Sequence, residues 1–319
     1  MRHVFIIDPL EKLVIKKDST LLLAHTLSAR AEVLISFEKD WFFESGRGKK
    51  EVRCYQFDSE LVDGYHLKKF ETTDEQMVEL NREVLVHMRK DPPFDRSYLH
   101  MCWILQEVVK TGAKVINDPS QLLMINEKLI AYADPNTIPT LISRDVSVGV
   151  QYADKLRKEG HESVIIKPLD LYQGIGVQKV NIDNELSQKL EKAIEDYQGV
   201  YVMQPFVKKV EEGEIRSVFF ANQHIGSIIK VPPQGSYLAN IAQGAKYSAV
   251  ELEPEVMQAC LKYSDELMQK GVPFTAFDIL DGKISEINIT CPGLLVEVAN
   301  ALQKNVCEDI CDLIQKHWV

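Results

Sequence analysis

The sequence predicts an α/β protein, and three observations support this fold class. An apolar segment at residues 4–7 is followed by a capped helical pattern and by a second apolar segment at residues 32–37. This order of strand, helix and strand is typical of an open α/β layer. A third buried-strand pattern occurs at residues 83–88. Near the C-terminus, Asp281-Gly282 stands between two apolar runs, which is a strong signal for a β-hairpin.

Bulk composition limits the classes of function. The chain has 319 residues, enough for two or three domains that share a core. Its net charge of −10 argues against a nucleic-acid-binding surface. The N-terminal apolar run is too short for a signal peptide and no stretch approaches membrane-spanning length, so we expect no membrane partner. Six cysteines without a CxxC pair favour a reducing compartment, and we expect a cytoplasmic protein.

The first part of the chain is predicted from local patterns. Asp18 or Ser19 caps a helix that runs to about residue 30. Alternating apolar and polar residues predict a strand at residues 52–57. The remaining elements that we expect here are a helix near residues 73–80, a strand at 83–88, a helix at 98–110 and a strand at 114–116. The charged loop that begins at Arg89 follows a predicted strand, and ligands bind at such strand ends in open α/β sheets.

From residue 126 onward the pattern changes. A helix opens at Asn126, and a buried strand at residues 163–168 carries Lys167 near its end, where a lysine can bind phosphate as a point charge. Gly174 and Gly176 would let the next loop fold over that lysine, although a plain strand-turn-strand explains the pattern equally well. We further expect helices at residues 145–160, 184–197, 254–270 and 294–316, strands at 200–206, 214–220 and 224–231, and a long loop at 232–248.

The predicted hairpin near the C-terminus offers oxygen ligands for a metal. Glu286 and Asn288 share one face of its second strand because side chains alternate along a strand. A two-residue loop would pair Asp278 with Ser285 and send Glu286 to the opposite face. A three-residue loop would keep Asp278, Glu286 and Asn288 together. That second geometry suits Mg²⁺, which takes hard oxygen ligands. A surface hairpin with a solvated acidic face is the alternative interpretation.

The motifs occur in an order that resembles the ATP-grasp ligases, and the resemblance narrows to the prokaryotic-type glutathione synthetases. It spans nearly the whole chain. The run RKDPPFD and the pairing of NEK with KPLD are its specific parts. The matching segments are Ile7–Pro9, Ile15–Ser19, Met88–Asp95, Asn126–Leu129, Lys167–Asp170, and Asp278 together with Glu286–Thr290.

This resemblance implies a three-domain ATP-grasp fold that begins with an open α/β domain, the pre-ATP-grasp domain. Residues 1–122 would form this N-terminal, substrate-side domain. Residues 123–205 would form the central lid domain, and residues 206–319 the C-terminal domain with the metal-binding hairpin. ATP would lie between two antiparallel sheets of the central and C-terminal domains. A homo-oligomer, either a dimer or a tetramer, is implied as well.

The resemblance also implies an ATP-dependent carboxylate–amine ligase. A substrate carboxylate would take the γ-phosphoryl group of ATP, stabilised by Arg216, and an amine would then displace phosphate. In the glutathione synthetases these two small molecules are γ-glutamylcysteine and glycine. Mg²⁺, with Mn²⁺ as an alternative, would be bound by Asp278, Glu286 and Asn288. The residues implied to contact the nucleotide are Lys128, Lys167, Asp170, Gly174, Gln204 and Phe206, and those implied to contact substrate are Asp18, Ser19, Arg89 and Asn240.

Three departures from the family concern the substrate side. The lid loop after Lys167 keeps fewer glycines, and Leu238 and Val296 stand where the family has arginines expected to meet substrate carboxylates. Losing such a partner costs about 1.5–3 kcal/mol. Lys230 or Lys246 could replace the missing charge, although we interpret both as surface lysines. Two other functions therefore stay open: ligation of a less anionic or more apolar carboxylate, and nucleotide binding by a regulator without ligase activity.

Overall fold

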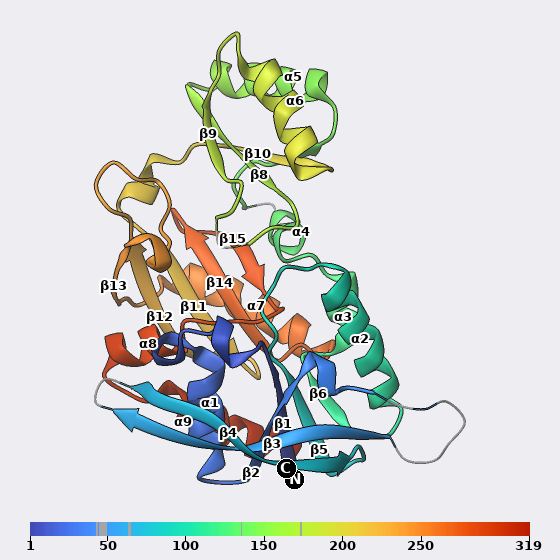
Figure 1. The fold of residues 1–319 in the computed structure, drawn as a ribbon. Coiled ribbons are helices and arrows are strands. Elements are labelled where there is room, and N and C mark those ends of the chain that lie inside the picture. Colours follow the sequence, from blue (N-terminus) through green and yellow to red (C-terminus); the bar gives the residue numbers. More distant parts are fainter. Residues whose placement is uncertain (43, 45–49, 63–64, 135, 173) are drawn as a thin grey trace.

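The structure is a computed structural model that describes residues 1–319 except 43, 45–49, 63–64, 135 and 173. Gln173 of the expected lid loop therefore lies outside the described residues. The described strands form three sheets, and each sheet takes its strands from one stretch of the chain. Figure 1 shows the sheet with β8–β10 standing above the other two.

The N-terminal sheet has the strand order β4-β3-β2-β1-β5-β6. Its centre is parallel, since β1 pairs with both β2 and β5, and β5 pairs with β6. The predicted open α/β layer is thus confirmed. Its elements are β1 (Arg2–Ile7), α1 (Ser19–Ser28), β2 (Glu32–Phe37), β3 (Glu51–Val62), β4 (His66–Glu79), β5 (Val84–Met88), α2 (Arg96–Val109), β6 (Lys114–Ile116) and α3 (Pro119–Met124).

The helix expected near residues 73–80 is wrong, because residues 73–79 belong to β4. This strand pairs antiparallel with β3 from Val62↔His66 to Glu51↔Glu79. Burial alternates along its end: Met77 is 45% exposed, whereas Val78 is fully buried. Pairing with a long neighbouring strand outweighs the local helical preference of the sequence.

The central and C-terminal sheets are antiparallel, with the orders β7-β10-β8-β9 and β13-β12-β11-β14-β15. The elements of the central part are α4 (Glu127–Tyr132), β7 (Leu141–Ser143), α5 (Val146–Lys158), β8 (Ser163–Pro168), β9 (Gln178–Asn181), α6 (Leu186–Tyr197) and β10 (Tyr201–Pro205). Those of the C-terminal part are β11 (Glu214–Phe220), β12 (Gln223–Val231), β13 (Lys246–Ala249), α7 (Pro254–Gln269), β14 (Phe274–Leu280), β15 (Lys283–Asn288), α8 (Leu295–Leu302) and α9 (Val306–Trp318).

Two predictions for the C-terminal part need correction. The single helix expected at residues 294–316 is two helices, because Gln303 adopts a left-handed conformation (φ +53°) that ends α8, and Asn305 caps α9. The loop expected at residues 232–248 overlaps β13, whose exposed residues pair with β12 at the sheet edge. An exposed edge strand has no buried face, so it lacks the alternation by which strands are detected.

Hydrophobic packing joins the N- and C-terminal parts into one body. One cluster links α1 with α9, for example through Leu22 and Ile310, and a second links α2 with β14 and β15, for example through Met101 and Phe277. A third cluster, which includes Tyr201, lies wholly within the central part. The central part therefore has a core of its own above the shared body (Figure 1).

Asn117 connects the N-terminal part to the hairpin strands through its buried side chain. Its Nδ2 donates to the backbone oxygens of Phe274 (2.8 Å) and Ile289 (2.7 Å). Its Oδ1 accepts from the backbone N–H of Phe274 at 3.0 Å. These three hydrogen bonds hold β14 and the end of β15 beside the N-terminal sheet.

We predict that Asn117→Ala lowers the free energy of unfolding by roughly 2–4 kcal/mol, because three buried backbone groups lose their partner. Urea unfolding, followed by circular dichroism, measures this change. The change is taken from the first unfolding transition as the urea concentration rises. The control is Asn184→Ala at an exposed position, for which we expect a change within about 0.5 kcal/mol. Equal effects of the two variants would contradict the proposed role of Asn117.

Candidate active site

A cavity of about 490 Å³ lies where the three parts of the chain meet. This volume is in the range of small-molecule sites. The central sheet contributes Lys167 and Gln204 to its lining, the C-terminal sheet contributes Arg216, and the N-terminal part contributes Arg89. Every candidate residue from the sequence lines this cavity except Asp170, whose side chain is exposed outside it. The candidate residues are thus brought together from widely separated positions in the chain.

The hairpin of β14 and β15 has a geometry that neither sequence alternative described. Its loop is the two residues Asp281 and Gly282, both at positive φ (+53° and +70°), as in a type I′ turn. A β-bulge next to the turn then inserts Ser285, so that Asp278 lies opposite Glu286. The hydroxyl of Ser285 donates to the backbone oxygen of Asp278 at 3.1 Å. The bulge thereby sets both carboxylates on one face despite the two-residue loop.

Asp278 is the most strongly bonded of the predicted metal ligands. Arg216 donates to both of its carboxylate oxygens, at 2.9 and 2.8 Å. Lys230 donates to Oδ1 at 3.1 Å and Asn288 to Oδ2 at 3.0 Å. Burial alone would raise the pKa of Asp278, but Arg216 and Lys230 outweigh it and lower the pKa to about 2. Asp278 is therefore ionised at neutral pH.

Lys230 was not among the site residues predicted from sequence, and its interpretation as a surface lysine is wrong. It is only 5% exposed and also binds Glu214, with Nζ 2.9 Å from Oε2. Its strand, β12, lies inside the sheet next to β11, and Glu214 is its direct cross-strand partner. Lys246, by contrast, is exposed on β13, as expected. Lys230 is a basic residue within a central strand of the sheet. Its place in that strand was the sequence signal that could have indicated a buried lysine.

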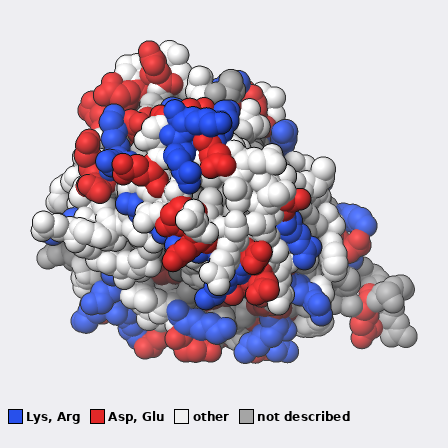
Figure 2. Space-filling view, turned by 90° about the horizontal axis from the view of Figure 1, so that it is seen from above, with Lys and Arg blue, Asp and Glu red and all other residues white. Residues whose placement is uncertain are grey.

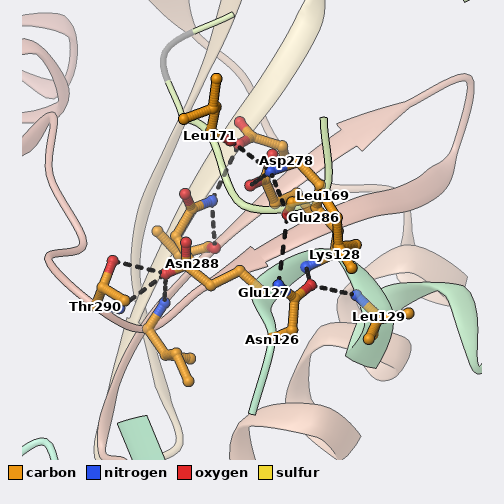
Figure 3. Close-up of polar contacts among 12 residues, drawn as sticks. Asn126, Glu127, Lys128, Leu129, Leu169, Leu171, Asp278, Glu286, Asn288 and Thr290 are labelled. Atoms are coloured by element: carbon orange, nitrogen blue, oxygen red, sulfur yellow. Dashed lines mark hydrogen bonds and ion pairs between the residues drawn. The ribbon is translucent and has the colours of Figure 1, made fainter. Parts of the chain in front are cut away.

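Lys128 ties helix α4 to both the hairpin and the loop after β8. The side-chain oxygen of Asn126 accepts from the N–H of Lys128 at 3.1 Å and so caps α4. Lys128 Nζ donates to the backbone oxygens of Leu171 (2.7 Å) and Leu169 (3.3 Å), and lies 3.4 Å from Oε1 of Glu286. Figure 3 shows these contacts converging between α4 and the hairpin.

Glu127 is a second residue that sequence reasoning missed. Its Oε1 accepts from the backbone N–H groups of Ile289 (2.6 Å) and Thr290 (2.8 Å) and from the Thr290 hydroxyl (2.9 Å), as drawn in Figure 3. Burial and the nearby carboxylate of Glu286 raise the pKa of Glu127. It fixes the segment that follows Asn288, so it positions the predicted metal ligands without being one. Its place between Asn126 and Lys128 in the NEK motif was the available signal.

Several cationic side chains gather at this face of the cavity. Burial lowers the pKa of Lys167, while Glu286, Glu214 and Asp278 raise it. The cationic side chains are those of Lys128, Lys167, Arg216 and Lys230, and the carboxylates are those of Glu214, Asp278 and Glu286. Glu127 also lines the cavity, so the four cations face four carboxylates. Four cationic side chains on one face can bind the oxygens of an anionic ligand that carries several charges, such as a polyphosphate.

At the end of β10 the cavity wall becomes apolar. The Gln204 side chain donates to the Thr140 hydroxyl at 2.8 Å, and the backbone N–H of Phe206 donates to Ser163 at 3.0 Å. Lys179 Nζ lies 3.6 Å from the centre of the Phe206 ring. The amide of Phe206 is therefore already bonded, and Phe206 itself offers a ring surface to a bound group.

The N-terminal part supplies the opposite end of the cavity. Asp18 caps α1 by accepting from the N–H of Leu21 at 2.8 Å, and burial raises its pKa to about 6. The hydroxyl of Ser19 accepts from the N–H of Leu295 at 2.9 Å.

In the C-terminal part, the side-chain oxygen of Asn240 caps a short turn by accepting from Ala242 N–H at 2.9 Å.

Leu238 and Val296, which stand where the family has arginines, lie in different surroundings. Leu238 lines the cavity beside Gly174 of the lid loop. Val296 is only 4% exposed and packs in the hydrophobic cluster that joins α1 and α9, so it does not line the cavity. Of these two positions, it is therefore Leu238 that places an apolar side chain on the cavity wall.

Comparison with known proteins identifies the family. The model of the prokaryotic glutathione synthetase N-terminal domain matches residues 1–122, and that of the prokaryotic glutathione synthetase ATP-grasp domain matches residues 127–303. The chain belongs to the prokaryotic glutathione synthetase family. It is an ATP-dependent C–N ligase of the glutathione synthetase type, which confirms the resemblance seen in the sequence. The hypothesis of a regulator without ligase activity is not favoured.

Relatives extend over nearly the full length of this glutathione synthetase family member. The glutathione synthetase of Vibrio parahaemolyticus is 28% identical over 98% of this chain and 96% of its own length. That of Prochlorococcus marinus subsp. pastoris is 28% identical over 98% of both chains. Among solved structures, D-cycloserine synthetase DcsG has a TM-score of 0.64 at 14% identity, covering 98% of this chain and 99% of its own. The ATP-grasp ligase PsnB complexed with minimal precursor, Mg and ADP has a TM-score of 0.64 at 16% identity, covering 98% and 96%. These likenesses confirm the ATP-grasp fold.

Other potential sites were considered over the described part of the chain. Within it, no three His, Cys, Asp or Glu side chains are grouped to hold a metal ion. Two carboxylates and an amide suffice for Mg²⁺ that also binds phosphate oxygens. None of the described helices is both long enough and apolar enough to cross a bilayer. Figure 2 shows basic and acidic side chains interspersed over the face seen from above.

All six cysteines are free thiols. Five are buried, and Cys291 is partly exposed at the cavity. Burial raises the pKa of every one of them: to about 12 for Cys54, Cys102, Cys260 and Cys311, and well above the usual range for Cys291 and Cys307. The thiols are therefore protonated at neutral pH.

We predict that Asp278→Asn destabilises the metal-free protein by roughly 3–5 kcal/mol at pH 7, because Arg216 and Lys230 lose their buried anionic partner. The folded-state pKa of Asp278 is lowered, so its contribution is complete above the unfolded-state pKa of about 3.9. The contribution is lost as the pH falls from there towards about 2. We therefore expect the difference in free energy of unfolding between wild type and variant to shrink below pH about 4. Urea unfolding at a series of pH values measures this difference.

The matched control is Asp281→Asn in the turn of the same hairpin. Asp281 pairs with the exposed Lys209 at 2.7 Å. An exposed pair of this kind contributes at most about 1 kcal/mol. If Asp278→Asn lowers the free energy of unfolding by no more than Asp281→Asn does, the buried Arg216 and Lys230 do not need the carboxylate of Asp278.

Proposed function

We propose that the protein joins γ-glutamylcysteine to glycine with ATP, forming glutathione, ADP and phosphate. The observation that carries this proposal is the register of the hairpin, which aligns Asp278, Glu286 and Asn288 on the wall of the cavity that Lys128 and Lys167 also line. The family supports the type of reaction, and the substrate pair rests on the names of the relatives. We also propose a cytoplasmic homo-oligomer, in line with the family and with six free thiols.

The reaction needs two displacements. In the first, an oxygen of the cysteinyl carboxylate attacks the γ-phosphorus, an O–P bond forms, and the bond from the γ-phosphorus to ADP breaks. In the second, the neutral amine of glycine attacks the acyl carbon, the C–O bond to phosphate breaks, and the nitrogen loses a proton. Both steps need charge stabilisation on phosphoryl oxygens and exclusion of water.

The residues of the cavity suit these needs. Lys128 and Lys167 neutralise phosphate charge, and Arg216 stabilises the transferring phosphoryl group. Two carboxylate side chains and an amide side chain on one face fit Mg²⁺, or Mn²⁺, and the ion would be held by Asp278, Glu286 and Asn288. When bound, it supplies Lewis-acid stabilisation of phosphate oxygens. Leu171, whose backbone oxygen Lys128 binds, begins the loop that excludes water from the acyl phosphate.

A second candidate is a less anionic or more apolar carboxylate substrate. It is favoured by one observation, the apolar side chain of Leu238 at the cavity where the family has an arginine. The two candidates share the nucleotide chemistry and differ only in the substrate pair. They are therefore separated by substrate use and not by nucleotide binding.

The first experiment measures ADP release by purified protein with ATP and Mg²⁺, and identifies products by mass. We expect γ-glutamylcysteine plus glycine to give glutathione, with turnover that depends on both substrates. A panel of amino acids and dipeptides serves as comparison. Efficient turnover of another pair, with none for γ-glutamylcysteine, would overturn the proposed substrates and support the second candidate.

We predict that Glu286→Gln lowers kcat at least about 100-fold, because an amide would replace one of the two carboxylates that would hold Mg²⁺. Near-UV circular dichroism and the thermal midpoint check that the fold is retained. The control is Glu251→Gln, which removes an exposed carboxylate outside the cavity and should leave kcat unchanged. Near-normal activity of Glu286→Gln with Mg²⁺ would contradict the assignment of Glu286 as a metal ligand.

A further inference from the structure

Lys167 differs from the other cations of the cavity in what its ammonium group contacts. Lys128, Arg216 and Lys230 each bind carboxylate or backbone oxygens. Among the described residues, by contrast, none forms a hydrogen bond or an ion pair with Nζ of Lys167. What this group meets is an aromatic ring, since Nζ lies 5.6 Å from the centre of the Tyr132 ring. A cation over a ring face at this distance is attracted by the quadrupole of the ring.

Helix α4 brings Tyr132 to this position. Tyr132 stands four residues after Lys128, so the two side chains share one face of the helix. Figure 1 shows α4 beside β15, below the central sheet. Burial raises the pKa of the Tyr132 hydroxyl, the nearby Glu286 raises it further, and Lys128 lowers it. The ring therefore lies among the groups that we propose to hold phosphate and metal.

The ring and the ammonium group belong to different hydrophobic cores. Tyr132 packs against the cluster that links α2 with β14 and β15. Lys167 is carried by β8, whose buried residue Ile166 packs in the separate cluster of the central part. Lys167 lines the cavity, whereas Tyr132 does not. Tyr132 can therefore influence a nucleotide in the cavity through Lys167 and not by direct contact.

A ring suits this ammonium group better than a carboxylate would. Burial lowers the pKa of Lys167, so its charged form needs a stabilising neighbour. A carboxylate in direct contact would supply that stabilisation, but it would occupy N–H donors that a phosphate would then have to win back. A ring face attracts the charge and leaves the three N–H donors of a lysine available.

We propose that Tyr132 is a positioning residue for Lys167. Its ring holds the ammonium group at the cavity wall, apart from the neighbouring carboxylates, so that phosphate oxygens meet a cation that is already in place. This inference rests on the proposed function in one respect, which is that Lys167 binds phosphate. It does not depend on which carboxylate and amine the enzyme joins.

The hydroxyl of Tyr132 has no part in this role. It is buried and has no hydrogen-bond partner in the described structure. Tyr132→Phe removes the hydroxyl and keeps the ring, whereas Tyr132→Leu removes the ring and keeps an apolar side chain. These two variants therefore separate the effect of the ring from that of the hydroxyl.

The test measures binding of AMPPNP, a non-hydrolysable ATP analogue, with Mg²⁺ by isothermal titration calorimetry, in the absence of carboxylate and amine substrates. We expect Tyr132→Phe to bind within about twofold of wild type. Tyr132→Leu should raise the Kd roughly 3- to 30-fold, the size of one cation–π contact. Because Tyr132 acts through Lys167, Tyr132→Leu should cause no further loss in a Lys167→Gln background.

Tyr152→Leu is the matched control. Tyr152 is also a partly buried tyrosine whose hydroxyl has no partner in the described structure, but it lies on α5, outside the cavity. The control should keep the wild-type Kd, whatever it does to the thermal midpoint. If Tyr132→Leu does not stay folded, Tyr132→Met takes its place, because methionine also fills space without a ring face.

Three results would overturn the inference. Wild-type affinity in Tyr132→Leu would show that the ring is not needed. Equal losses in Tyr132→Phe and Tyr132→Leu would assign the effect to the hydroxyl. An undiminished loss from Tyr132→Leu in the Lys167→Gln background would show that Tyr132 acts by another route, such as the packing of α4.

Failure of the proposed function gives a different result. A protein that joins another substrate pair would form no glutathione in the ADP-release assay and would still show the ring-dependent affinity for AMPPNP. Conversely, glutathione formation together with an unchanged Kd in Tyr132→Leu would support the proposed function and overturn the inference.

Discussion

Asp278 keeps its negative charge in the protein interior because Arg216 and Lys230 reach it from two neighbouring strands. Since β11 lies between β12 and β14, the three side chains meet on one face of the sheet. The bulge at Ser285 brings Glu286 to the same face, because without it Glu286 would point away from Asp278. The backbone register of one short hairpin thus determines whether the cations, the carboxylates and Asn288 form a single site. Asn117 and Glu127 reinforce that register from outside the hairpin.

Lys128 joins this rigid site to the part of the chain with its own core. It binds the backbone oxygens of Leu169 and Leu171 and also lies beside Glu286. A phosphate that approaches Lys128 competes with those backbone oxygens for the same ammonium group. If Lys128 binds phosphate as we propose, nucleotide binding and the position of the loop after β8 would be linked through this one side chain. The central part has a hydrophobic cluster of its own, separate from the core of the shared body.

Local signals in the sequence were sufficient where the chemistry is local. Asp18 and Asn126 were recognised because helix caps need a side-chain acceptor at one position, and they cap α1 and α4. The bulge at Ser285 and the burial of Lys230 were not recognised from the sequence, because both depend on which strands become neighbours. The same cause explains β4, where pairing with β3 overrides the local pattern.

The six protected thiols have a consequence for a protein that makes a thiol product. Burial raises the pKa of all six thiols, to about 12 for Cys54, Cys102, Cys260 and Cys311, so few of them are thiolates at pH 7. Exchange with a disulfide requires the thiolate, so these cysteines react slowly with the oxidised form of glutathione. Even Cys291, at the edge of the cavity, is held protonated. If glutathione is the product, the protonated state of these thiols would slow the formation of mixed disulfides between the enzyme and the oxidised form of its own product.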